Sequence, residues 1–167
     1  MTDEDARALF LSHFDSTRAI GLRLLASKSI LARLMPLSSA WLEEAGVLDY
    51  LPFDAFIQQF GSMQDALHGP VFRGVLELEQ YTEKPLTPRD VADMMEKLGI
   101  IDDASAWHDL RKMRNVLAHE YTNDRATQAR RINEAYRAID DLVAVFNRIH
   151  AYVTTKGLAD LSGCPPL

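Results

Sequence analysis

Residues 123–153 read NDRATQARRINEAYRAIDDLVAVFNRIHAYV, and this stretch decides the fold class. Seven apolar residues and one histidine recur in it at alternating steps of three and four: Ala129, Ile132, Tyr136, Ile139, Val143, Phe146, His150 and Val153. This rhythm follows the 3.6-residue turn of an α-helix and is typical of a helix packed in a bundle. Asn123 or Asp124 supplies the N-cap. The sequence therefore predicts a long helix with one buried face.

The segments before this stretch carry the same period. A first long helix contains Ile20, Leu24 and Leu31 and stops at Pro36, and a short helix over Ala40–Leu48 follows, capped by Ser38 or Ser39. A third row at the same spacing, apolar except for Gln64, predicts a helix that Gly69-Pro70 bends or splits. Its members are Phe53, Ile57, Phe60, Gln64, Leu67, Val71, Val75 and Leu78.

Two further helices are predicted by their boundary residues. Thr87-Pro88-Arg89-Asp90 is a capped helix start after the loop at residues 84–88, and Gly99 provides a left-handed exit after Leu98. Asp102 or Asp103 caps the next helix. No segment has the pattern of a strand, and no repeat is found. The sequence predicts an all-α protein, an antiparallel helical bundle with short connections.

Length and composition favour one domain. The chain has 167 residues, of which 47% are hydrophobic, so residues 1–156 are expected to form a single helical domain, followed by a tail at 157–167. The single cysteine, Cys164, is expected to be an inert thiol in a mobile end. The acidic start and the lack of a long apolar run predict a cytoplasmic protein without a membrane partner.

Charge is distributed unevenly along the chain. The net charge is −6, which argues against a general nucleic-acid binder, yet residues 111–137 carry +4 and the remainder carries −10. Arg111, Lys112 and Arg125 are therefore candidate RNA-binding residues around this basic segment. The alternative is a solvated helix face with ordinary charge scatter.

The chemistry-bearing motif is Trp107 to Tyr121, WHDLRKMRNVLAHEY. Arg114 keeps its charge at neutral pH and grips phosphate with two parallel hydrogen bonds, while His119 can exchange a proton near neutrality. Arg114 falls within the apolar arc of the predicted helix, whereas Asn115 and His119 lie on its polar side, with Asn115 able to orient the imidazole. An arginine can also lay its stem along apolar surface and lift its head into water.

A regular helix places Arg114 and His119 about 140° apart, which aligns them poorly. Two solutions remain open from the residues alone. Either the helix ends near Ala118 and the chain turns His119 back, or two copies meet and share their motif residues.

The motif, together with the helical segments around it, resembles a HEPN domain, most closely its HepT-like branch, over Phe53 to Val153. The resemblance implies a two-fold homodimer whose paired motifs line one groove. It implies a metal-independent endoribonuclease toxin with no cofactor, which uses His119 as general acid or base and Arg114 to stabilise the transition state, while Asn115 orients the imidazole or contacts phosphate. It also implies a cognate minimal nucleotidyltransferase antitoxin that silences the toxin by transferring AMP to Tyr121.

Two other functions are compatible with the sequence. A non-catalytic HEPN-like partner that helps a nucleotidyltransferase bind nucleotide or target is the main alternative, and a purely structural helical adaptor is the other. His13, His68, His108 and His150 show no metal-ligand spacing and are interpreted as structural. Gly61-Ser62 begins like a nucleotidyltransferase signature, but no Asp-x-Asp follows at a suitable distance, so the chain is not that enzyme itself.

Overall fold

The protein is an all-helical bundle in the computed structural model, which describes residues 2–81, 86–119 and 123–167, with only the backbone of Ala118 and His119. Across these ranges the elements are helical and no strand occurs, as the sequence predicted. In chain order they are α1 (Asp3–Leu31), η1 (Ala32–Leu34), α2 (Ser39–Glu44), η2 (Val47–Tyr50), α3 (Leu51–Ala66), η3 (Leu67–Val71), α4 (Phe72–Leu78), α5 (Pro88–Lys97), α6 (Ala104–His119) and α7 (Arg125–Lys156).

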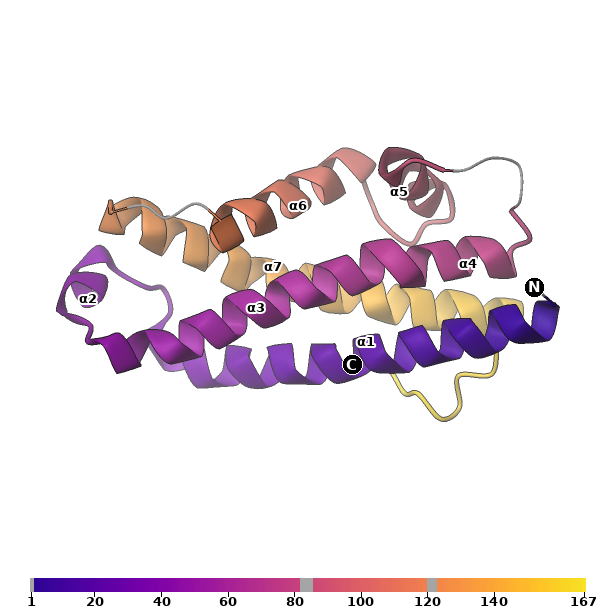
Figure 1. Ribbon diagram of the computed structural model, residues 1–167, viewed down its shortest axis with the longest axis horizontal. Helices are drawn as coiled ribbons and strands as arrows, with labels where there is room; N and C mark the ends of the chain where they lie inside the picture. Colours follow the sequence, from indigo (N-terminus) through magenta and orange to yellow (C-terminus); the bar gives the residue numbers. More distant parts are fainter. Residues whose placement is uncertain (1, 82–85, 120–122) are drawn as a thin grey trace.

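The long helices lie roughly side by side (Figure 1). Helix α1 packs along α3 and α4, α7 runs behind them, and α6 lies on the side of α3 away from α1. Helices α2 and α5 cover opposite ends of the bundle. The motif helix α6 is thus supported by both α3 and α7, and it forms one outer side of the molecule.

Side-chain caps set most helix starts. Thr87 and Asp90 form the predicted capping box at α5, and Thr2 and Asp5 form a second one at α1, which was not predicted. Where two cap residues were open, the structure selects one in each case: Ser38 for α2, Asp103 for α6 and Asp124 for α7. Gly99 has a φ of 72°, the predicted left-handed exit after α5.

The short second helix ends earlier than predicted. Helix α2 stops at Glu44 instead of Leu48, because the backbone N–H of Gly46 donates to the Asp49 carboxylate at 2.8 Å and a new 3-10 turn starts there. The predicted bend or split at Gly69-Pro70 takes the form of a split, because the π-helical turn η3 separates α3 from α4. A π turn leaves Pro70 inside a continuous helical path, although proline has no N–H to donate.

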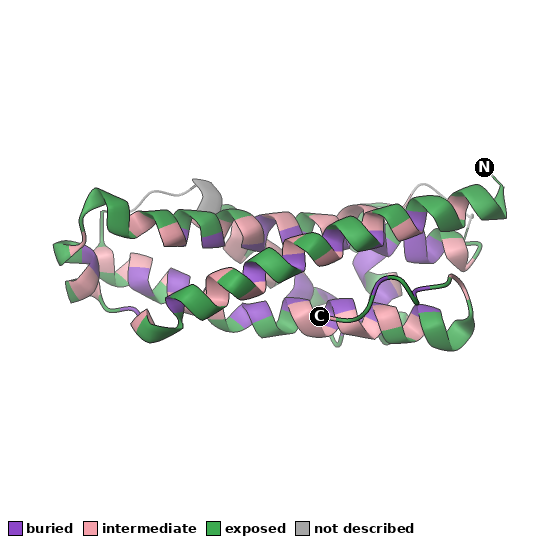
Figure 2. Ribbon diagram, turned by 90° about the horizontal axis from the view of Figure 1, so that it is seen from below, coloured by how far each residue is buried: buried purple, intermediate pink, exposed green. Residues whose placement is uncertain are grey.

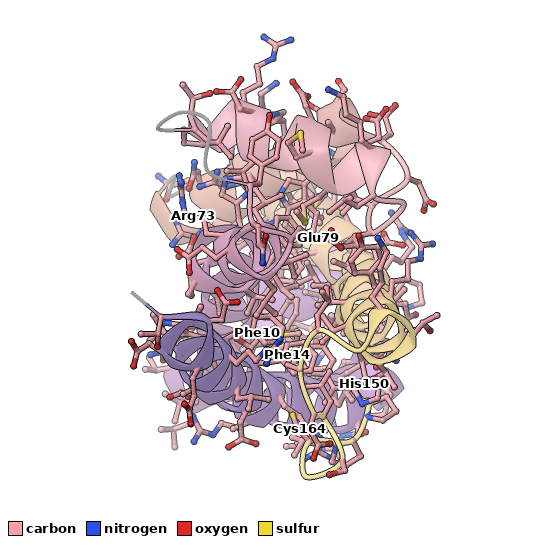
Figure 3. The ribbon with its side chains drawn as sticks, turned by 90° about the vertical axis from the view of Figure 1, so that its right-hand side faces the viewer. Phe10, Phe14, Arg73, Glu79, His150 and Cys164 are labelled. Atoms are coloured by element: carbon pink, nitrogen blue, oxygen red, sulfur yellow. The ribbon has the colours of Figure 1, made fainter. Side chains whose placement is uncertain are left out.

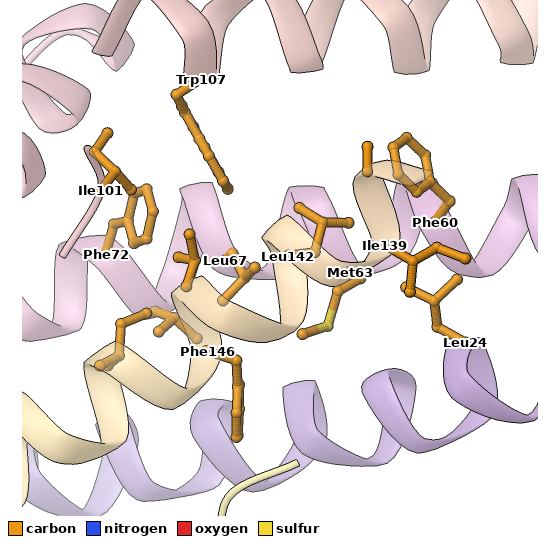
Figure 4. Packing of buried hydrophobic residues seen from close by; sticks show 14 of the residues in the cluster. Leu24, Phe60, Met63, Leu67, Phe72, Ile101, Trp107, Ile139, Leu142 and Phe146 are labelled. Atoms are coloured by element: carbon orange, nitrogen blue, oxygen red, sulfur yellow. The ribbon is translucent and has the colours of Figure 1, made fainter. Parts of the chain in front are cut away.

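Buried phenylalanines and aliphatic side chains from α1, α3, α4 and α7 fill the interior (Figures 2 and 4). Phe14 of α1 stacks on Phe10 and on Phe146 of α7, with the centroids of the Phe14 and Phe146 rings 4.3 Å apart. Trp107 extends from α6 towards Phe72 at a centroid distance of 5.1 Å, so the motif helix joins the same core. Among the described residues no helix is long and apolar enough to cross a membrane.

The C-terminal tail corrects the expectation of a mobile end. Leu161 and Cys164 are buried, and Asn147 exchanges two hydrogen bonds with the backbone of Leu167, at 2.8 and 3.0 Å. Arg18 of α1 donates to the Pro165 carbonyl at 2.6 Å. Burial raises the pKa of the Cys164 thiol, which keeps it protonated near neutral pH and poorly nucleophilic. Figure 3 shows the tail folded back on the bundle with Cys164 against it.

Helices α1 and α4 approach each other closely at Gly74, and the contact can be tested by its effect on stability. A Cβ added at Gly74 would lie 2.8 Å from Cδ2 of Phe10, whose ring is fully buried and stacked on Phe14. We expect Gly74→Ala to lower the free energy of unfolding by about 1–3 kcal/mol, as overpacking does, measured by urea denaturation.

The matched control is Gly69→Ala, because a Cβ there meets no atom within 4 Å. Its effect should stay within about 1 kcal/mol, the scale of helix propensity. Equal losses in the two variants would contradict the close-packing explanation.

Candidate functional site

Arg114 reaches from α6 across to α3. Its guanidinium forms an ion pair with Asp65 and donates to Oδ1 of Asn115 at 2.8 Å. The side chain is 28% exposed, so its stem lies against protein while part of its head meets solvent. The arginine on the apolar arc therefore follows the snorkelling geometry, with a carboxylate holding the head.

Gly61 makes room for this side chain. A Cβ built at Gly61 would lie 3.2 Å from Nε of Arg114 and 3.5 Å from its Cγ. Glycine inside a helix costs roughly 0.5–1 kcal/mol relative to alanine. Gly61 of α3 carries this cost, and the absence of its Cβ leaves room for the Arg114 stem.

The Arg114 head lines a pocket of about 580 Å³ between α3, α6 and α7, which we call the Arg114 pocket. Arg125 and Arg131 of α7 also line it, together with the carboxylates of Asp54 and Asp65. Arg125 donates to Gln128 at 2.8 Å and lies 5.9 Å from the centre of the Tyr50 ring. Three arginines and two aspartates thus line one pocket near the end of the motif helix, and the excess of arginine suits a phosphate group.

The predicted site residues separate onto two sides of α6. Arg114 and Arg125 both line the Arg114 pocket. Asn115, Arg111 and Lys112 line a different pocket, next to α5. The two sides are joined where the Asn115 amide oxygen accepts a hydrogen bond from Arg114.

The other two motif residues are His119 and Tyr121. Helix α6 continues through His119, one residue beyond the early turn considered above, so positions 114 and 119 lie about 140° apart around its axis. The side chain of His119 and all of Tyr121 lie outside the described residues. The predicted acid–base role of His119, its orientation by Asn115 and the acceptor role of Tyr121 therefore stay predictions.

Sequence reasoning missed three members of the Arg114 pocket: Gly61, Asp65 and Arg131. A glycine four residues before an aspartate on one face of a predicted helix was the available signal for a guanidinium from another helix. Nothing along the chain indicated which arginine would meet Asp65, because the contact joins positions 49 residues apart. In the described ranges, no group of three or more His, Cys, Asp or Glu side chains could hold a metal ion.

Comparison with known proteins identifies the family. Residues 38–149 match the family model described as "Nucleotidyltransferase substrate binding protein like". No curated protein and no solved structure matches the chain. Because the match covers more than half of the 167 residues, the chain belongs to this HEPN-like family, which is associated with nucleotidyltransferases.

The contact between Gly61 and Arg114 is testable apart from any activity. In Gly61→Ala the new methyl group should push the Arg114 side chain by a few tenths of an ångström, because it starts 3.2 Å from Nε. We expect the Arg114 Nε–Hε signal in a ¹H–¹⁵N spectrum to shift, while the free energy of unfolding changes by no more than about 1 kcal/mol. Gly69→Ala is again the control, and an unmoved Arg114 signal in Gly61→Ala would contradict the contact.

Proposed function

We propose that this member of the nucleotidyltransferase substrate binding protein-like family is a metal-independent endoribonuclease toxin, controlled by a partner nucleotidyltransferase. The observation that carries the proposal is the Arg114 pocket, which Arg114, Arg125 and Arg131 line beside the end of the motif helix. Three fixed cations offer an RNA phosphodiester both charge and directed hydrogen bonds.

The proposed reaction uses the 2′-hydroxyl of RNA as nucleophile. Its oxygen attacks the adjacent phosphorus, the bond from phosphorus to the 5′-oxygen of the next nucleotide breaks, and a 2′,3′-cyclic phosphate and a free 5′-hydroxyl result. One proton leaves the 2′-hydroxyl and one is delivered to the 5′-oxygen. His119 takes the role of general base or acid in these transfers, and no cofactor enters the balance.

Arg114 stabilises the extra negative charge that develops on the phosphoryl oxygens, often the largest single contribution to such catalysis. Asp65 supports this role because it holds the guanidinium in place before substrate arrives. A pre-positioned donor avoids reorganisation when the charge develops. Asn115, bound to Arg114 at 2.8 Å, either contacts phosphate or orients the imidazole in this scheme.

A two-fold homodimer completes the proposed site. Positions 114 and 119 lie on different sides of one α6 helix, so a single copy aligns them poorly with one phosphate. Two copies related by a two-fold axis would supply an arginine from one chain and a histidine from the other to the same cleft.

A second candidate function is the non-catalytic binding partner. It is favoured by the Arg114–Asp65 ion pair, which partly neutralises the cation that catalysis requires, and by the description of the family as substrate binding. In that case the Arg114 pocket would bind nucleotide or target RNA for the nucleotidyltransferase without cleaving it.

The nuclease proposal predicts cleavage of single-stranded RNA in the presence of a chelator. Arg114→Ala and His119→Ala should each lower the cleavage rate by roughly 10²-fold or more, the usual contribution of an acid–base or charge-stabilising group. Arg23→Ala removes an exposed arginine from the remote helix α1 and should cleave normally. Folding of each variant is checked by circular dichroism.

Two outcomes would reject the catalytic assignment. Normal cleavage by folded Arg114→Ala and His119→Ala proteins would contradict the residue roles. RNA binding that depends on Arg114, without any cleavage by the native protein, would select the non-catalytic partner instead.

Control by the nucleotidyltransferase is proposed to act at Tyr121. Transfer of AMP to its hydroxyl would place negative charge and bulk two residues after His119, where RNA phosphate must bind. Like charges would then repel the substrate. The alternative is that Tyr121 packs on the apolar side of the motif with its hydroxyl at the edge.

This regulation predicts a defined mass change. Incubation with the cognate nucleotidyltransferase and ATP should add one or more AMP units to the native protein and abolish cleavage. Tyr121→Phe should keep its RNase activity and resist modification, because only the acceptor oxygen is removed. Intact-mass spectrometry and the RNA assay measure both results, and a Tyr121→Phe protein that is still modified and silenced would show that another residue is the acceptor.

A further inference from the structure

A second basic pocket lies on the other side of α6, where the motif helix meets α5. Its volume is about 460 Å³. Its lining includes Arg89 from the first turn of α5 and Ser105, His108, Arg111, Lys112 and Asn115 from α6. We call this the Arg111 pocket. Arg114, Arg125 and Arg131 do not line it, so it is separate from the Arg114 pocket.

The charges of the Arg111 pocket are unbalanced. Three of its lining residues are cations, Arg89, Arg111 and Lys112, and the only carboxylate among its described lining residues is Asp109. Asp109 is already bound to Lys112 at 3.0 Å. Within the part of the chain that the structure describes, neither Arg89 nor Arg111 forms an ion pair. A protein with net charge −6 thus concentrates unpaired positive charge at one concave place.

Two histidines lie near these cations: His108 lines the Arg111 pocket, and His68 of η3 is affected by the charge of Arg111. His68, only 6% exposed, accepts a hydrogen bond at Nδ1 from Nε1 of Trp107 at 3.0 Å, so its own proton lies on Nε2. Burial, followed by electrostatic repulsion from Arg111, His108 and Arg73, lowers the pKa of His68 to about 4. Nε2 of His68 and Nε2 of His108 have no hydrogen-bond partner among the described residues. Buried polar atoms without partners are rare in folded proteins.

We propose that the Arg111 pocket is a phosphate-binding site in which Arg89 and Arg111, from two different helices, hold the phosphate oxygens. A planar guanidinium matches a phosphate with paired hydrogen bonds, and a single phosphate accepts from more than one arginine. Ser105 and Asn115 add uncharged hydrogen-bonding groups to the lining. The phosphate belongs to a nucleotide or to an RNA backbone, and neither source requires the protein to cleave RNA.

The position of Asn115 connects this pocket to the Arg114 pocket. Its side chain lines the Arg111 pocket, while its Oδ1 accepts from Arg114 on the other side of the helix. That bond leaves the Asn115 amide nitrogen as a donor. Asn115 therefore offers a donor to a phosphate in the Arg111 pocket while it remains bound to Arg114.

The test is titration of the full-length protein with inorganic phosphate, AMP and a single-stranded RNA oligonucleotide, by calorimetry for the first two and filter binding for the third. Arg89→Gln and Arg111→Gln should each weaken binding about tenfold or more, the effect of losing one charge-assisted contact. Arg23→Gln is the matched control, because it removes the same charge from the exposed surface of α1. For RNA, each pocket substitution should also reduce the slope of log affinity against log salt by about 0.7.

Spectroscopy of the histidine rings localises the ligand. Phosphate should shift the ring signals of His108, which lines the pocket, and leave those of His13 on α1 unchanged. Arg114→Gln should keep this shift, even if it abolishes RNA cleavage, so failure of the nuclease proposal and failure of this one are distinguishable. A nucleotide ligand is identified by AMP binding that the pocket substitutions weaken, and an RNA backbone by losses confined to the oligonucleotide. The proposal is overturned if Arg89→Gln and Arg111→Gln bind all three probes like the native protein, or if Arg23→Gln weakens binding equally.

Discussion

The polar contacts between α6 and the helical path of α3 and η3 fix the motif helix, and the geometry of both pockets depends on them. Towards the start of α6, the indole of Trp107 donates to the buried ring of His68. Two turns later, Arg114 pairs with Asp65. Because the two contacts lie at different heights on α6, together they set its register on α3 and its rotation about its own axis. Apolar packing alone, which has no direction, would define this rotation less sharply.

Polar groups buried beside these contacts lower the free energy of unfolding, and apolar packing elsewhere in the bundle offsets the loss. Between His68 and Gly61, the side chain of Gln64 is 1% exposed, and both its amide atoms lack hydrogen-bond partners among the described residues. Each unsatisfied buried group costs about 1–3 kcal/mol. The stacked phenylalanines of α1 and α7 supply the dense apolar packing that offsets this cost. Natural proteins keep violations of this kind mainly at functional sites, which agrees with a motif helix held by polar contacts.

The fold was predictable because helix periodicity and capping are local. The α7 helix, the capping box of Thr87 and Asp90, the split at Gly69-Pro70 and the exit at Gly99 all depend on short windows of sequence, and the structure confirms them. The predicted buried row of α7 is confirmed only in part, because Tyr136, Val143 and His150 are half-buried. The predicted end of α2 was wrong because a single hydrogen bond, from the Gly46 N–H to the Asp49 carboxylate, starts a new turn there. The packed tail was missed because its partners, Arg18 and Asn147, lie far away in sequence or on another helix.

The candidate site was predictable only in its composition. Arg114 was singled out because a cation on an apolar arc breaks the helical pattern, but its partners Asp65 and Gly61 depend on how α3 faces α6. The same reason explains why Arg89 joins Arg111: only the packing of α5 on α6 brings them to one pocket. The net charge of the whole chain is a poor guide to phosphate binding, since affinity for phosphate depends on the local field. A net charge of −6 is compatible with two basic pockets, because each pocket is lined by more cations than carboxylates, and α6 contributes residues to both. For the proposed RNA ligand, cations on both sides of one helix favour a flexible single strand over a rigid duplex.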